Sequence, residues 1–201
     1  MTSRGKPGAT RMKWRVNPGA LVFFAVLLFT GKRTFLAVFL AAAFHEAGHL
    51  LAARQMGIAL RCMELDLFGA KLIPAAALPS YRAEWVLAAG GPAFSLLLAL
   101  LLLPFSAPFA VALRFASASF AVFNLLPVSG FDGGRMFFAT LARRLSVRAA
   151  VTVLHCGTYL TLLFLFCLSS CLLLRYGQNL ALFVLCAVLF AKIFLPAGTA
   201  V

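Results

Sequence analysis

Long apolar segments separated by short groups of arginine and lysine constrain this chain more than any other feature. Hydrophobic residues make up 63% of its 201 residues, and only 11% are charged. A soluble domain averages about 25% charged residues, so the chain is predicted to be an integral membrane protein. Its length allows about six membrane-spanning helices and little else. We therefore expect a single domain over residues 1–201, without a separate regulatory or PDZ domain.

The charge pattern predicts how these spans are oriented. The net charge is +13, but the basic residues lie at the ends of apolar segments rather than along one stripe, which argues against nucleic-acid binding. Residues 1–15 contain five basic residues and no acid, so they are expected to form a cytoplasmic arm. The protein is thus predicted to be a multi-pass protein of the cell membrane with a cytoplasmic N-terminus.

Six spans are expected. The first apolar run resembles a signal peptide, but the nearest small-residue cleavage pattern would cut directly before His45, so we expect an uncleaved span. The expected spans cover approximately residues 16–32, 34–54, 84–103, 112–126, 149–173 and 178–196.

Residues 57–75 break the helical pattern, because polar and apolar residues alternate there with a period of two. This alternation predicts two short strands joined by a turn at Phe68–Lys71. The expected fold is therefore an all-α polytopic membrane protein with about six transmembrane helices and a short membrane-associated β-hairpin after the second.

An H-E-x-x-H motif lies inside the second apolar segment. Its histidines, His45 and His49, are four residues apart and therefore share one face of a helix. Two such imidazoles can bind one Zn²⁺, and Glu46 between them can accept a proton from water. Two histidines and a glutamate in lipid would be costly without a partner. The motif therefore predicts a metal site with one zinc per chain and Glu46 as the catalytic base.

A catalytic zinc usually has three protein ligands. The candidates for the third are Asp132, His155 and an acidic residue of the expected hairpin. The orientation places His45, His49 and Asp132 near the cytoplasmic face, which favours Asp132. An acid there could instead cap the next helix or pair with Arg135. For His155, a hydrogen bond between helices is the expected role.

Three motifs together resemble the site-2 protease family of intramembrane zinc metalloproteases. They are HEAGH at 45–49, GGPAFS at 90–95 and NLLPVSGFDGGR at 124–135. The resemblance covers about residues 18–195, and the compact six-span layout is most similar to the branch containing stage IV sporulation protein FB. It implies that His45, His49 and Asp132 bind zinc and that Glu46 is the general base.

The resemblance also implies positioning roles near the substrate for Asn124, Gly91 and Pro92, and a role in holding substrate for segment 59–75. Two positions depart from the family pattern. Ser95 stands where the family usually has Asn, so a positioning hydrogen bond is expected to differ. Gly130 and Phe131 replace the usual Pro-Leu, which is expected to make that loop more flexible.

The expected function is zinc-dependent cleavage of a transmembrane or membrane-associated segment of a regulatory protein near the cytoplasmic face. Its partners would be a membrane-tethered substrate, the lipid bilayer and a regulatory membrane protein. Two alternatives stay open. A catalytically silent relative would bind membrane segments without cutting them, and a metal transporter would use the same side chains as a transit site. A transporter should carry further acids or histidines along a path, and this chain has few.

Overall fold

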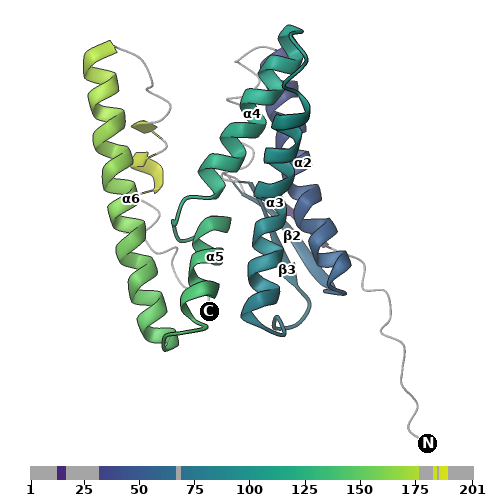
Figure 1. The fold of residues 1–201 in the computed structure, drawn as a ribbon, viewed down its shortest axis with the longest axis vertical. Coiled ribbons are helices and arrows are strands. Elements are labelled where there is room, and N and C mark those ends of the chain that lie inside the picture. The colour runs from purple at the N-terminus through teal and green to yellow at the C-terminus, as the bar shows by residue number, and fades with distance from the viewer. Residues whose placement is uncertain (1–12, 17–31, 67–68, 177–182, 185, 190–201) are drawn as a thin grey trace, which may run out of the picture. The chain divides into compact units, whose positions relative to one another are not determined.

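The structure, a computed structural model, describes residues 13–16, 32–66, 69–176, 183–184 and 186–189 (Figure 1). The chain forms two compact units, residues 1–125 and 126–201, which we describe one at a time. The first unit contains β1 (Lys13–Val16), α2 (Lys32–Gln55), β2 (Leu60–Asp66), β3 (Gly69–Pro74), α3 (Tyr81–Leu101) and α4 (Pro108–Asn124). The second contains α5 (Asp132–Leu141) and α6 (Val147–Tyr176).

Among the described residues, three helices are long and apolar enough to cross a membrane: α2, α3 and α6. They correspond to the second, third and fifth expected spans. The apolar helix α4 corresponds to the fourth, although it has only 17 residues. Helix α2 starts at Lys32, which was expected to end the preceding span. The expected spans at 16–32 and 178–196 lie almost entirely outside the described residues.

Helices α2, α3 and α4 pack side by side in the first unit because small residues line their contacts (Figure 1). Buried residues recur every three or four positions along α2, as expected for one face of a helix. Besides the two histidines, it consists of Ala37, Ala41, Gly48, Ala52 and Ala53. Small side chains allow helix backbones to approach closely, which is how helices associate in lipid, where apolar burial gives no advantage.

Large apolar side chains lie on the outside of the same helices. Their exposed fractions reach 45% for Phe39, 53% for Leu100 and 64% for Phe115. A soluble protein would place such residues inside and polar ones outside. Here the large apolar residues are exposed while His45, His49, Ser95 and the Oγ of Ser117 are buried. This distribution fits helices surrounded by lipid.

A three-stranded sheet adjoins α2 in the first unit, with β2 at its centre. Strands β2 and β3 pair antiparallel, with Glu64 opposite Lys71 and Asp66 opposite Gly69. Gly69–Lys71 therefore belong to a strand rather than to the expected turn. Strand β1 pairs parallel with β2 on the other side. The sequence analysis placed β1 in a basic arm, because four residues with two basic side chains give little strand signal.

In the second unit, α5 packs against α6. The segment before α5 forms a tight turn, in which the N–H of Phe131 donates to the carbonyl of Val128 at 3.0 Å. Gly130 has φ +99° at the third position of this turn, a conformation that favours glycine. The structure thus gives Gly130 a defined place in a hydrogen-bonded turn, where the sequence analysis expected added flexibility.

Candidate metal centre

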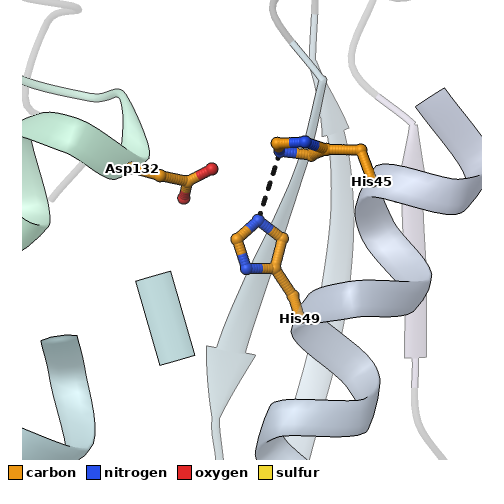
Figure 2. A group of neighbouring side chains, drawn as sticks. All are labelled: His45, His49 and Asp132. Atoms are coloured by element: carbon orange, nitrogen blue, oxygen red, sulfur yellow. Dashed lines mark hydrogen bonds between the residues drawn. The ribbon is translucent and has the colours of Figure 1, made fainter. Parts of the chain in front are cut away.

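His45 and His49 lie on successive turns of α2, with their rings turned toward one another (Figure 2). Their exposed fractions are 3% and 5%. The two Nε2 atoms are 3.3 Å apart, and the rings meet edge to face. The four-residue spacing of the motif therefore places the two histidines on one helix face, as predicted, with both Nε2 atoms directed toward one point.

The separation of the Nε2 atoms fits a shared metal ion. Two nitrogens bound tetrahedrally to zinc at 2.0–2.1 Å from the ion are about 3.3–3.4 Å apart. The observed 3.3 Å agrees with this spacing. The donor set is also suitable, since neutral imidazole nitrogens bind zinc well. Hence the residues present fit a zinc ion held between His45 and His49.

The remaining ring nitrogens of both histidines are held by α3. His49 Nδ1 lies 2.8 Å from the carbonyl oxygen of Leu87, and His45 Nδ1 lies 2.9 Å from the Oγ of Ser95. Such contacts fix the orientation of metal-binding imidazoles. The backbone N–H of Gly91 is also 3.3 Å from His49 Nδ1. We assign the shorter contact, because a carbonyl can only accept and Nδ1 must therefore carry the proton.

Gly91 forms the wall of α3 that faces the two Nε2 atoms. A Cβ at this position would lie 2.6 Å from His45 Nε2 and closer still to His49 Nε2. The absence of a side chain therefore leaves the space in which a bound ion would sit. The next residue, Pro92, is buried in the interior of α3 and has no N–H to donate within the helix. The structure places Gly91 at the histidines.

Glu46 follows His45 in α2 and is half-buried, with its Oε2 atom buried. Asn124 ends α4, and its side-chain nitrogen donates to the carbonyl of Phe120 at 3.1 Å. The ring of Phe120 lies against that of His45, with 5.8 Å between their centroids. Asn124 is therefore one helical turn beyond the aromatic ring that covers His45.

Asp132 belongs to the second unit, where it is the first residue of α5; its carboxylate is also drawn in Figure 2. It is buried, with an exposed fraction of 8%. The residue that caps the helix is Phe131, so Asp132 is not the N-cap. Arg135 Nη1 lies 3.9 Å from its Oδ1, at the outer limit of an ion pair. Of the two structural roles considered for Asp132, the N-cap position is thus occupied by Phe131, and the ion pair with Arg135 is present at a long distance.

The turn that leads to Asp132 is fixed by α6. The N–H of Ser129 donates to the Oγ1 of Thr158 at 2.9 Å. That hydroxyl in turn donates to the carbonyl of Leu154 at 2.8 Å, in preference to the more distant carbonyl of Pro127 at 3.4 Å. Gly134 packs so closely under the carbonyl of Val128 that a Cβ would clash with it.

The other candidates for a third ligand lie on α6 and on β2. His155 is exposed on α6, and within the part of the chain that the structure describes it makes no hydrogen bond. The expected hydrogen bond between helices is thus not found there. Glu64 and Asp66, the acids of the expected hairpin, belong to β2.

Sequence reasoning missed two parts of this site. One is the carbonyl of Leu87, a backbone group that any residue type would supply, so the residue type at this position gives no signal. The other is Thr158, which lies 26 residues from Asp132 in sequence. The position of Leu87 four residues before Gly91 could have suggested a shared helix face with Gly91 and Ser95.

Comparisons with known proteins agree with the fold. Residues 104–168 match the sequence model of Peptidase family M50, a stretch that includes Asp132 but not His45 or His49. The structure is similar to that of the site-2 protease from Methanocaldococcus jannaschii, with a TM-score of 0.65. Sequence identity is 18%, and the match covers 92% of this chain and 90% of that chain. No curated protein sequence matches this chain significantly.

Proposed function

We propose that this protein is a zinc-dependent intramembrane endopeptidase that cleaves a transmembrane or membrane-associated segment of a regulatory protein. The observation that carries the proposal is the pair of buried Nε2 atoms, 3.3 Å apart, on an apolar helix. The match to Peptidase family M50 and the site-2 protease fold support the same activity. The compact layout further suggests the branch of stage IV sporulation protein FB.

Asp132 is the proposed third ligand. It is buried, it offers one carboxylate oxygen, and it lies within the stretch that matches the M50 model. Two imidazoles and one carboxylate are a donor set found in catalytic zinc sites, which keep one position for water or substrate. His45, His49 and Asp132 would thus hold one Zn²⁺ per chain.

A zinc ion held there would supply Lewis acidity to polarise the scissile carbonyl and to make water more acidic. Glu46 would take a proton from the attacking water and return it to the amine that leaves. The position of Glu46 next to His45 and the burial of its Oε2 suit this role, because a general base must be close to the metal-bound water from which it takes a proton.

Substrate would be held by the sheet. A helical substrate hides its peptide bonds, so it must unwind before cleavage and its freed amides then need hydrogen-bond partners in lipid. Strand β3 lies at one side of the three-stranded sheet and β1 at the other. An unwound segment added beside β3 would gain backbone hydrogen bonds, as in other cases of β-augmentation.

The cleavage site would face the cytoplasm in the cell membrane, and so would the N-terminus. Strand β1, near the N-terminus, pairs with β2, which follows the end of α2 by only a few residues. The N-terminal strand and the C-terminal end of α2 therefore share one side of the membrane. The basic residues of the N-terminal arm assign that side to the cytoplasm.

The first test is the zinc content of the full chain purified in detergent. We expect about one zinc per chain in the wild type and a large loss in His49→Ala and in Asp132→Asn. Retention of zinc by Asp132→Asn would reject the third ligand. Absence of zinc from folded wild type after metal is added back would reject the protease proposal.

Cleavage is tested with Glu46→Gln, which keeps the shape of the side chain and removes the base. Membranes from cells that express wild type or Glu46→Gln are compared by mapping new protein termini. Wild type should produce termini inside apolar segments that Glu46→Gln, with normal zinc, does not. Equal patterns from the two proteins would favour a silent binder, and zinc transport that survives Glu46→Gln would favour a transporter.

A further inference from the structure

Ser95 makes one contact that has no part in the proposed cleavage reaction. It is fully buried on α3, one helical turn after Gly91, and its Oγ lies 2.9 Å from His45 Nδ1. Within the residues that the structure describes, the Oγ of Ser95 makes no other hydrogen bond. A serine hydroxyl can donate one hydrogen bond and can also accept, whereas a carbonyl can only accept. Ser95 and Leu87 therefore hold their histidines in chemically different ways.

The partner of His49 fixes its proton. Because the carbonyl of Leu87 can only accept, His49 Nδ1 must donate, and its Nε2 then carries a lone pair. That lone pair can bind a metal ion, or it can accept a hydrogen bond from His45 Nε2 at 3.3 Å. His49 is thus in the metal-binding tautomer in either case.

His45 has to change its tautomer between these two cases. Without a metal ion, its Nε2 carries the proton that is donated to His49, so its Nδ1 is an acceptor and Ser95 must donate. With a metal ion, Nε2 gives its lone pair to the ion, so Nδ1 carries the proton and Ser95 must accept. A hydroxyl serves both states by rotating its hydrogen, and the imidazole does not need to turn.

We propose that Ser95 is a positioning residue for His45 whose hydroxyl donates in the metal-free site and accepts in the metal-bound site. The buried hydrogen bond to Oγ keeps the ring in one orientation while its proton moves from Nε2 to Nδ1. The inference rests on the proposed function, since it assigns Ser95 a part in loading the same zinc site. It concerns metal binding and not the cleavage step itself.

Zinc affinity is the first readout, measured by competition with a chromophoric chelator on the full chain in detergent. Loss of an outer contact to a metal-binding histidine typically weakens metal binding by about 10–100-fold. We expect a loss of this size in Ser95→Ala and recovery of most of it in Ser95→Thr, which keeps the hydroxyl. The matched control is Ser117→Ala. Ser117 is equally buried on α4, but its Oγ makes no hydrogen bond to the described residues.

The second readout is the tautomer of His45, observed by NMR of protein with ¹⁵N-labelled histidine. The chain has three histidines, and His155→Gln leaves only the two of the site. We expect the proton of His45 to be on Nε2 without zinc and on Nδ1 with zinc, while His49 keeps its proton on Nδ1. In Ser95→Ala the metal-free His45 should still carry its proton on Nε2, because His49 Nε2 still accepts it.

Wild-type zinc affinity in Ser95→Ala would overturn this proposal and leave the proposed function intact. A proton on His45 Nδ1 both with and without zinc would also overturn it. The same holds for a Ser95→Thr variant that keeps wild-type thermal stability yet binds zinc as weakly as Ser95→Ala. A folded wild type that binds no zinc would overturn both proposals. The first three results therefore reject only the role of Ser95, whereas the last rejects the zinc site as well.

Discussion

Gly48 and Gly90 bring the backbones of α2 and α3 into direct contact. A Cβ added at Gly90 would lie 2.6 Å from the carbonyl oxygen of Gly48, and one added at Gly48 would clash with Gly90. The contact lies next to His49 on α2 and next to Gly91 on α3. The distance between the histidines and the groups of α3 that hold them therefore depends on two positions without side chains.

Substitution of Gly48 by alanine should separate these helices. The added methyl group meets backbone atoms and the Cβ of Phe94, which cannot move aside as a flexible side chain could. Forcing extra atoms into such a contact typically costs about 1–3 kcal/mol. We expect a lower thermal midpoint in detergent and weaker zinc binding. Ala43→Ser, at an exposed position of α2, is the control; a wild-type midpoint in Gly48→Ala would contradict the close contact.

Substitution of Gly91 by alanine should act on the metal site more than on the fold. Its Cβ would meet the imidazole nitrogens, which belong to side chains, rather than another backbone. We expect zinc to be lost while the protein stays folded, as measured by metal content and thermal midpoint together. Gly157→Ala on α6 is a matched control, because its Cβ would make ordinary contacts at 3.8 Å or more. Full zinc content in Gly91→Ala would show that the ion does not sit between the histidines and α3.

The sequence could predict the features that depend on local helix geometry and on apolar composition. The H-E-x-x-H spacing predicted the helix, the shared face and the meeting of His45 with His49, because all three follow from local helix geometry. Apolar runs likewise predicted the helices that can cross a membrane. The metal itself, the role of Glu46 and the third ligand stay predictions.

The sequence analysis was less successful where a role depends on packing between segments. It expected a positioning role near the substrate for Gly91 and an altered positioning hydrogen bond at Ser95, which stay predictions; what it did not predict is that Gly91 faces both histidines and that Ser95 contacts His45. It treated Ser95 as a departure from the family's asparagine, but a hydroxyl, like an amide, can donate or accept. It also missed β1, because a parallel pairing with β2 across about 50 residues has no local signal.

Thr158→Val should loosen the turn before Asp132. Valine has a similar shape but cannot accept from the N–H of Ser129 or donate to Leu154. Loss of such hydrogen bonds costs about 1 kcal/mol, so a modest fall in thermal midpoint is expected, together with weaker zinc binding through Asp132. Thr152→Val is the control, since Thr152 is exposed on the same helix and, within the described residues, its hydroxyl donates to the carbonyl of Arg148 alone. Equal effects of the two substitutions would show that Thr158 has no special part in placing the turn.

Zinc should stabilise the folded protein by mass action. A ligand that binds only the folded state adds about 4 kcal/mol when its free concentration is a thousand times Kd. We expect a strong chelator to lower the thermal midpoint of the wild type, and added zinc to restore it. His49→Ala, which removes one of the two facing Nε2 atoms, should have a midpoint that neither chelator nor zinc changes. A zinc-dependent midpoint in His49→Ala equal to that of the wild type would place the stabilising ion elsewhere, because no ion shared by the two imidazoles could survive that substitution unaltered.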